Sequence, residues 1–455
     1  MKIHIRLENL LEKHLSIEEI RRYSRSFTKD PKNTLALNAV TENGIAAVAL
    51  SRKEVDRQNF TSSNLIESPD ATNQERSGRC WLFSGLSTLA LEAMKRLNLG
   101  TFELSEIYQM FWDKLEKANY FLENVIETGG EPLNGRLVRS LLSDPIPDGG
   151  EWNMFVNLIE KYGVIPKTFM PETANSNDSD PMNALFASKL REYAKALRDI
   201  NEKGASPTEL REKKGELIEE FYKMLCINLG VPPETFYWEW RDKDGLFHRR
   251  ANITPVQFYN EYVGVELDDF VSLINAPNKA FNKLYTVQYL GNMVGGRDTR
   301  YLNVDLKTIK KATVDMIKGN HAVWFGCDVG KMLQTNMGAM DLSIYDCESV
   351  YGTKFQLDKA ARLDYGDSEV THAMVITGVD LDEHGFPRKW RVENSWGAAI
   401  GDKGYMYMMD EWFDEYLYEV VVSKEYLSPE LLKILDTEPV VLSLWDPMCS
   451  LAKNR

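Results

Sequence analysis

The chain has 455 residues, 43% of them hydrophobic and 27% charged, so it is long enough to bury the cores of two or three domains. Its formal net charge of −14 excludes a uniformly basic surface for nucleic acid and leaves room only for a local basic patch. Five widely spaced cysteines without a Cys-x-x-Cys pair favour neither a disulfide framework nor a structural zinc site. With no apolar run of signal-peptide or membrane-spanning length, the sequence predicts a soluble cytoplasmic protein.

The first part of the chain is charged and predicted to be helical. Ser16 and Glu19 stand at capping-box spacing and open an amphipathic stretch that carries no chemical motif. From Asn59 to Gln74 the composition changes to Ser, Asn, Thr, Pro and Asp, which predicts an extended loop. Apolar residues then recur every three or four positions, so we expect a helix with Cys80 at its N-terminus.

Cys80 is the candidate nucleophile. The unpaired N–H groups and the positive dipole end of a helix N-terminus favour a thiolate, so we expect a lowered pKa for this thiol. Gln74 lies six residues earlier, and its side-chain amide could join the Cys80 backbone N–H in an oxyanion hole worth roughly 3 kcal/mol per donor. The alternative for a single cysteine is a buried structural residue on a core helix.

Two further helices are predicted before residue 170. Ser105 is a natural N-cap for a helix with an apolar face up to Leu122. Asp148-Gly149-Gly150 precedes an apolar helix from Trp152 to Tyr162. Adjacent glycines let a backbone approach another chain closely, although a simple turn has the same signature.

The middle of the chain is predicted to be a large, charged, mainly helical region. It contains two long helices, at about 182–202 and 208–226, and a hairpin of 236–240 with 247–249 that turns at Asp244-Gly245. His248 stands among arginines without a spaced partner and is expected at the surface. Such an amphipathic insertion is more typical of an assembly or covering element than of a second active site.

From His321 onward the pattern changes to strands, which predicts a mostly antiparallel β lobe facing the helical lobe that carries Cys80. The cleft between the two lobes is then the expected active site. The predicted strands are 322–325, 373–376, 390–394, 404–408 and 418–422.

His372 begins one of these strands and is the candidate acid and base, because imidazole exchanges protons near neutral pH. Asn394 follows 22 residues later and could accept a hydrogen bond from the ring, with Trp396 shielding that bond from water. His321 is a weaker alternative base without a following Asn motif, and His384 has the pattern of an exposed turn. Neither a phosphate loop nor a His-Glu-x-x-His motif occurs, so we expect no cofactor or metal.

The segments around these residues resemble those of papain-like cysteine peptidases. Ser77-Gly78-Arg79-Cys80-Trp81 has the form of the bleomycin hydrolase and aminopeptidase C branch and lacks the cysteine that secreted members use for a disulfide. Glu393-Asn394-Ser395-Trp396-Gly397 matches the second active-site segment, with Ile400 where a second Trp often stands. The elements Gln74, Cys80, His372 and Asn394 occur in the family's order, although 292 residues separate Cys80 from His372 against roughly 130 to 150 in the usual pattern.

The resemblance implies an α+β, papain-like two-lobe fold and a cysteine aminopeptidase that removes N-terminal residues from peptides. In this branch Gly149 and Gly150 would pair with the substrate backbone, the helical insertion would lie in a homohexameric ring, and bleomycin-type amide hydrolysis would be a further activity. The implied partners are peptides with a free N-terminus, with no membrane and no nucleic acid. The domains expected are an N-terminal extension (1–60), a helical lobe (61–170), a helical insertion (171–320), a β lobe (321–425) and a C-terminal arm (426–455).

The last residues resemble the C-terminal tail of the same branch, which enters the cleft and holds the substrate amino group with its terminal carboxylate. Here Cys449 and Ser450 replace Gly and Ala, and three residues follow Ala452. One hypothesis is that the enzyme trims itself to leave a carboxylate at or near Ala452, which an intact mass still ending at Arg455 would refute. Without the resemblance, such a tail would be interpreted as frayed or packed outside the cleft.

Two other functions remain as alternatives. A ring-shaped protein that binds single-stranded nucleic acid would bind with a steep salt dependence, and the acidic charge balance counts against it. A papain-like acyltransferase would pass its acyl group to amines rather than to water.

Overall fold

The structure is a computed structural model that describes residues 14–57 and 59–453. These residues form two compact units, one of 14–57 with 343–356 and the other of 59–342 with 357–453. In the first unit an antiparallel bridge joins Leu50 to Tyr345, and Ser51 N donates to Ile344 O over 2.9 Å. A segment that the sequence boundaries put inside the β lobe therefore packs with the N-terminal helices.

The first unit consists of short helices with little buried surface. Ser16 and Glu19 form the predicted capping box at the start of α2 (Ile17–Lys29), and Asp30 caps the next helix through Lys32 N. Helix α2 buries none of its residues, so its apolar side chains are exposed in the single chain. The other helices are α3 (Pro31–Asn43), α4 (Ile45–Ala49), α5 (Arg52–Val55) and α15 (Cys347–Tyr351).

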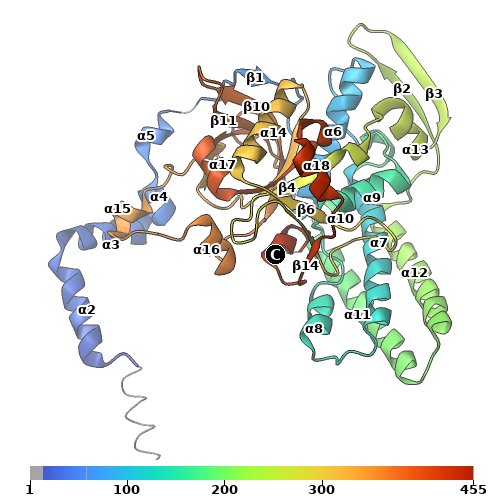
Figure 1. Cartoon of the computed structure of the whole chain (residues 1–455), viewed down its shortest axis with the longest axis horizontal. Helices are drawn as coiled ribbons and strands as arrows, with labels where there is room; N and C mark the ends of the chain where they lie inside the picture. Colours follow the sequence, from blue (N-terminus) through green and yellow to red (C-terminus); the bar gives the residue numbers. More distant parts are fainter. Residues whose placement is uncertain (1–13, 58, 454–455) are drawn as a thin grey trace, which may run out of the picture. The chain divides into compact units, whose positions relative to one another are not determined.

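The helical part of the second unit is built around α6 (Cys80–Leu97), which is buried along most of its length. Ser105 caps α7 (Glu106–Glu127) through Tyr108 N, as the sequence predicted. Two long helices, α11 (Asp180–Glu202) and α12 (Pro207–Leu229), pack along α7 (Figure 1). The remaining helices here are α8 (Arg136–Ser143), α9 (Trp152–Tyr162), α10 (Ala174–Asn177) and α13 (Pro255–Phe258).

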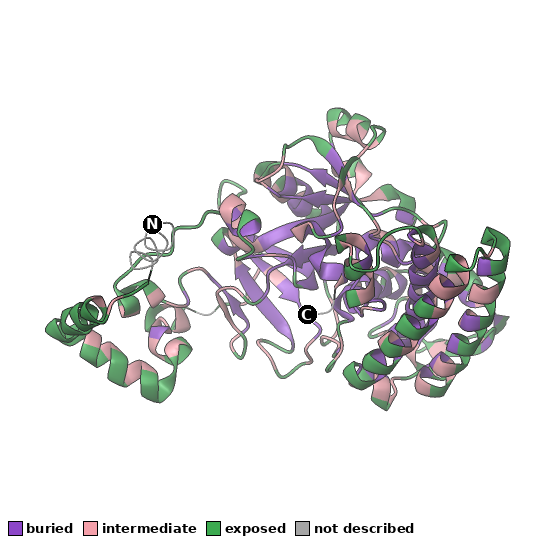
Figure 2. Ribbon diagram, turned by 90° about the horizontal axis from the view of Figure 1, so that it is seen from below, coloured by how far each residue is buried: buried purple, intermediate pink, exposed green. Residues whose placement is uncertain are grey.

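One large sheet forms the other part of this unit, with the strand order β14-β5-β6-β4-β13-β7-β10-β11-β12-β9-β8 and β1 beside β10. Most neighbours are antiparallel, and its central strands are buried on both faces (Figure 2). Along β7, Trp324 joins the core shared with α6, α7 and α9, whereas Val323 and Phe325 join the core shared with α14 (Leu306–Lys318) and α17 (Asp410–Tyr416). The strands are β1 (Asn64–Leu65), β4 (Phe270–Ile274), β5 (Lys283–Val287), β6 (Arg300–Asn303), β7 (Val323–Cys327), β8 (Leu333–Gln334), β9 (Ala339–Met340), β10 (His372–Leu381), β11 (Pro387–Glu393), β12 (Tyr405–Met409), β13 (Leu417–Ser423) and β14 (Val440–Leu442).

The five strands predicted after His321 correspond to β7, β10, β11, β12 and β13, and the predicted hairpin is β2 (Phe236–Arg241) with β3 (Phe247–Ile253). Strands β4, β5 and β6 were not predicted, and they extend the sheet into the region expected to be helical. Short strands buried on both faces lack the alternation that marks a strand in a sequence. Among the described residues, no helix is long and apolar enough to cross a bilayer.

Candidate active site

The loop before Cys80 is held by a buried arginine. Arg79 is 1% exposed, and its guanidinium donates to Ser176 O over 2.8 Å and to Glu172 Oε1 over 3.0 Å. The Arg79 carbonyl accepts from the N–H groups of Leu82 and Phe83, which forms the first turn of α6. Cys80 is therefore the first residue of α6, and the residue before it is held in place through both its side chain and its backbone carbonyl.

The structure brings His372 and Asn394 together beside this helix. His372 Nε2 lies 2.8 Å from Asn394 Oδ1, and the same oxygen accepts from Ser395 N over 2.7 Å. The ring of Trp396 lies against the imidazole with 4.9 Å between the ring centroids. Ala373 N, one residue after the histidine, donates to Cys80 Sγ over 3.4 Å.

Gln74 connects the two active-site segments. Its Nε2 donates to Ser77 O, and its Oε1 accepts from Ser395 Oγ over 2.6 Å. The backbone N–H of Gln74 also donates to Ser395 O over 2.8 Å. These bonds fix the side-chain amide and use one of its two N–H groups, which leaves the other for a ligand.

The expectation of a lowered pKa for Cys80 is wrong for this closed site. Burial raises the pKa of the thiol to about 11, although the N–H groups of Ala373 and Trp81 act in the opposite direction. Burial also lowers the pKa of His372 to about 4, against the hydrogen bond to Asn394. Removal from water disfavours both charged forms more than the helix N-terminus stabilises the thiolate, so the resting pair is neutral.

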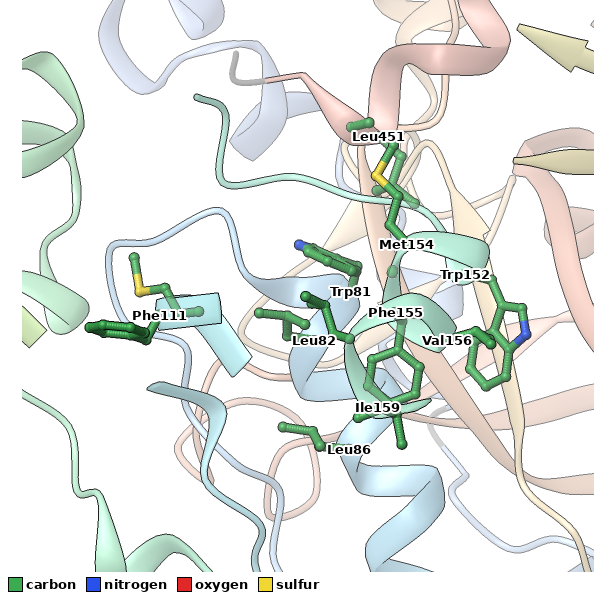
Figure 3. Close-up of a cluster of buried hydrophobic side chains, with 14 of the residues drawn as sticks. Trp81, Leu82, Leu86, Phe111, Trp152, Met154, Phe155, Val156, Ile159 and Leu451 are labelled. Atoms are coloured by element: carbon green, nitrogen blue, oxygen red, sulfur yellow. The ribbon is translucent and has the colours of Figure 1, made fainter. Parts of the chain in front are cut away.

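Gly149 and Gly150 are close-approach positions. A Cβ on Gly149 would lie 2.1 Å from Leu451 O, and a Cβ on Gly150 would lie 2.5 Å from the ring of Trp81. Neither has a positive φ, so the space available to them and not a turn conformation requires glycine. Figure 3 shows Leu451 beside Met154 and above Trp81.

The chain that meets Gly149 is the C-terminal arm, a 3-10 segment from Pro447 to Ala452. Ser450 Oγ donates to Val370 O over 2.8 Å, and Tyr301 Oη donates to Met448 O over 3.1 Å. The arm is thus bonded to the strand connection just before His372 as well as to β6. Asn454 and Arg455, on which the trimming hypothesis depends, lie outside the described residues.

A buried ionic network beneath Gly149 was not predicted. Lys114 Nζ lies 2.6 Å from Asp148 Oδ1, and Lys117 Nζ lies 2.6 Å from Asp113 Oδ2. Lys117 also donates to Gly149 O over 2.6 Å. Asp113, Lys114 and Lys117 lie close together on a helix with a predicted apolar face, and this grouping was the signal that the sequence analysis did not use.

Asp148 joins this network to the nucleophile loop. Its Oδ2 accepts from Gly78 N over 3.1 Å, and its backbone O accepts from Trp81 Nε1 over 2.7 Å. Burial acts to raise the pKa of Asp148, but the charge of Lys114 holds it well below its usual range. A charged Asp148 therefore positions Gly149 relative to the loop that ends at Cys80.

The other candidate residues lie away from this site. His321 pairs with Glu92 over 3.0 Å and lines a cavity of about 600 Å³ that includes neither Cys80 nor His372. His248 pairs with Asp242 over 2.8 Å, and His384 is exposed. Within residues 14–57 and 59–453, no group of His, Cys, Asp and Glu is arranged to hold a metal ion.

A thiol beside an imidazole that an amide orients, in a unit made of a helical part and a large sheet, defines the papain-like class of cysteine hydrolases. The chain belongs to the Peptidase C1-like family, whose sequence model matches residues 14–449.

Full-length relatives make the comparison more specific. The chain is 43% identical to bleomycin hydrolase of Homo sapiens over 450 residues, which cover 96% of this chain and 99% of the relative. It is 43% identical to aminopeptidase C of Listeria monocytogenes over 444 residues, which cover 97% and 100%. The crystal structure of PepW from Lactobacillus rhamnosis superimposes with a TM-score of 0.94 at 42% identity and covers 96% and 98% of the two chains. Together these matches show an α+β papain-like fold and a cysteine-type aminopeptidase.

Proposed function

We propose that the chain removes the N-terminal residue of peptides with Cys80 as nucleophile, His372 as acid and base, and Asn394 as the residue that orients the imidazole. The contact between His372 Nε2 and Asn394 Oδ1 carries this proposal. Because Asn394 Oδ1 also accepts from Ser395 N, it is an acceptor and Nε2 must carry the hydrogen. His372 Nδ1 is then left with a lone pair for the thiol proton.

The reaction follows from this tautomer. His372 Nδ1 takes the proton as the Cys80 sulfur attacks the carbonyl carbon of the first residue, and the imidazolium then protonates the leaving amine. The Cys80 backbone N–H and the second N–H of the Gln74 amide stabilise the oxyanion. Water hydrolyses the acyl-enzyme by the same route. The same site would hydrolyse the amide of bleomycin, the activity for which the human relative is named.

The C-terminal arm is proposed to make the enzyme an aminopeptidase. Leu451 and Ala452 lie against Gly149, where a substrate backbone extending before the cleaved bond would otherwise run. Gly149, Gly150 and Ala452 are therefore substrate-binding residues in this proposal. A variant that ends after Ser443 is expected to cut N-acetylated peptides as well as free ones, whereas continued exclusion of acetylated peptides would contradict this role of the arm.

A cytoplasmic homohexamer is proposed as the assembled form. Helix α2 supports it, because Ile17, Ile20, Tyr23 and Phe27 are all exposed on a helix without a buried residue. Such a face is stable in water when a second chain covers it. Sedimentation velocity should give the mass of six chains, and Ile20→Glu should lower it, whereas a monomer at micromolar concentration would contradict the proposal.

A further inference from the structure

Helix α6 carries two serines on the same face as Cys80, and the mechanism above uses neither of them. Ser84 and Ser87 lie four and seven residues after Cys80, a spacing that puts all three side chains on one side of an α-helix. Serines inside a helix often donate back to a carbonyl of their own helix. Both of these hydroxyls donate to the sheet instead, next to the residues that complete the active site.

Ser84 ties α6 to the strand that begins with His372. Its Oγ donates to Ala373 O over 3.0 Å, and Ala373 N donates to Cys80 Sγ over 3.4 Å. The N–H and the C=O of the residue after His372 are therefore both bonded to α6. These two bonds fix β10 relative to the nucleophile, but they do not reach Asn394.

Ser87 makes the corresponding bond to β11. Its Oγ donates to Glu393 Oε1 over 2.8 Å, and Glu393 Oε2 lies 3.4 Å from Tyr405 Oη of β12. Glu393 is the last residue of β11, and only 7% of it is exposed. Because side chains alternate along a strand and Val392 joins the core shared with α14 and α17, the Glu393 carboxyl is directed toward α6.

Asn394 follows directly and depends on this connection. It is the first residue after β11, so the regular pairing of the strands ends before it. Its Oδ1 lies 2.8 Å from His372 Nε2, and any turn of the strand end moves that acceptor away from the ring. The bond between Ser87 and Glu393 joins the residue before Asn394 to the helix that carries Cys80, about two turns along the helix from the nucleophile.

We infer that Ser87 and Glu393 are positioning residues for the reaction, because their hydrogen bond holds Asn394, and through it the His372 ring, at a fixed place relative to Cys80. The inference rests on the proposed function, in which Asn394 orients the imidazole. A displacement of about 1 Å in a catalytic site costs on the order of a hundredfold in rate, so a single buried bond that prevents part of such a displacement has a measurable effect.

The bond depends on an acceptor at Glu393 and not on its charge. Burial raises the pKa of Glu393, against the hydrogen bond from Ser87 and the charge of Arg391. Carboxylate, carboxylic acid and amide oxygens all accept from a hydroxyl. We therefore expect Glu393→Gln to preserve the geometry and Ser87→Ala to release it.

The test measures kcat and KM separately with alanyl-7-amido-4-methylcoumarin. Ser87→Ala should lower kcat by about tenfold with little change in KM, because the imidazole is misplaced while the substrate contacts remain. Ser87→Thr keeps the hydroxyl and Glu393→Gln keeps the acceptor, so both should retain most of kcat. Thr88→Ala is the matched control, because the Thr88 hydroxyl is also half-buried on α6 but donates within the helix, to Gly85 O over 2.7 Å.

The Asn394→Ala background separates positioning from a general effect on stability. If Ser87 acts through Asn394, Ser87→Ala should cause no further loss of kcat once the amide is absent. The same loss in both backgrounds, or an equal loss in Thr88→Ala, would overturn the inference, as would an unchanged kcat in Ser87→Ala. If Ser87→Ala does not fold, Glu393→Met, which keeps the side-chain length and removes the carboxyl oxygens, is measured in the same two backgrounds with the same expectations. Cleavage by Cys80→Ala would instead overturn the proposed function.

Discussion

Replacing Gly149 with alanine tests how the arm docks, because it adds a single Cβ atom where the arm contacts Gly149. The added Cβ would lie 2.1 Å from Leu451 O and 3.1 Å from Ala452 C, so the arm has to move by at least about 1.3 Å to bring the shorter contact to an ordinary 3.4 Å. Gly149 has no positive φ, so alanine adds a steric conflict without backbone strain.

The size of the effect follows from what holds the arm. Overpacking of this kind costs roughly 1–3 kcal/mol. Against it stand the burial of Met448 and Leu451, at roughly 1.5–3 kcal/mol each, and the hydrogen bonds of Ser450 and Tyr301, at roughly 1 kcal/mol each. Docking exceeds the conflict, so the arm should shift locally around Leu451 and remain bound.

We therefore expect Gly149→Ala to reduce kcat/KM for free-amine peptides and to permit slow cleavage of N-acetylated ones, less than complete removal of the arm does. Gly215→Ala on α12 is the control, because a Cβ there meets nothing within 4 Å. Both substrates are assayed by fluorogenic release, with the thermal midpoint as a check on folding. If Gly149→Ala excludes acetylated peptides as strictly as the unmodified enzyme, the arm does not close the cleft at Gly149.

Three further predictions concern the reacting groups and their support. Asn394→Ala should lower kcat by about two orders of magnitude with little change in KM, because the imidazole loses its orientation, and an unchanged kcat would contradict the proposed tautomer. Since burial raises the pKa of Cys80 and lowers that of His372, alkylation of the free enzyme by iodoacetamide should accelerate from pH 7 toward the thiol pKa of about 11, and a rate already constant from pH 6 would argue against a neutral resting pair. Asp148→Asn and Lys114→Met should each destabilise the fold by about 3–5 kcal/mol in urea unfolding, and the double variant by less than the sum. Because the pKa of Asp148 is depressed, its contribution should be present above its ordinary value of 3.8 and fall as the pH drops below that value.

The sequence predicted those parts of the fold that have a regular pattern or a cap. The Ser16 capping box, the Ser105 N-cap and the five strands after His321 all occur as expected. Strands β4 to β6 were not predicted, because each has five or fewer residues and its buried residues show neither helical nor alternating periodicity. The association of 343–356 with the N-terminal helices depends on bridges between residues far apart in the chain, which no local pattern encodes.

At the site, the sequence identified the residue types that the structure brings together, but it did not predict how burial shifts their pKa values. The position of Cys80 at a helix N-terminus suggested a lowered pKa. In the structure, burial of the thiol raises that pKa instead. Burial also hid the role of Asp148, since a charged residue beside a Gly-Gly pair has the signature of an exposed turn. Whether such a charge is solvated or buried depends on Lys114 and on the arm, both distant in the sequence.

The most direct test is to compare hydrolysis of a fluorogenic peptide with a free amino group and its acetylated twin, using the unmodified enzyme and Cys80→Ala. The account predicts that only the free-amine peptide is cut and that Cys80→Ala cuts neither. Equal cleavage of both peptides by the unmodified enzyme, or cleavage of either by Cys80→Ala, would contradict it.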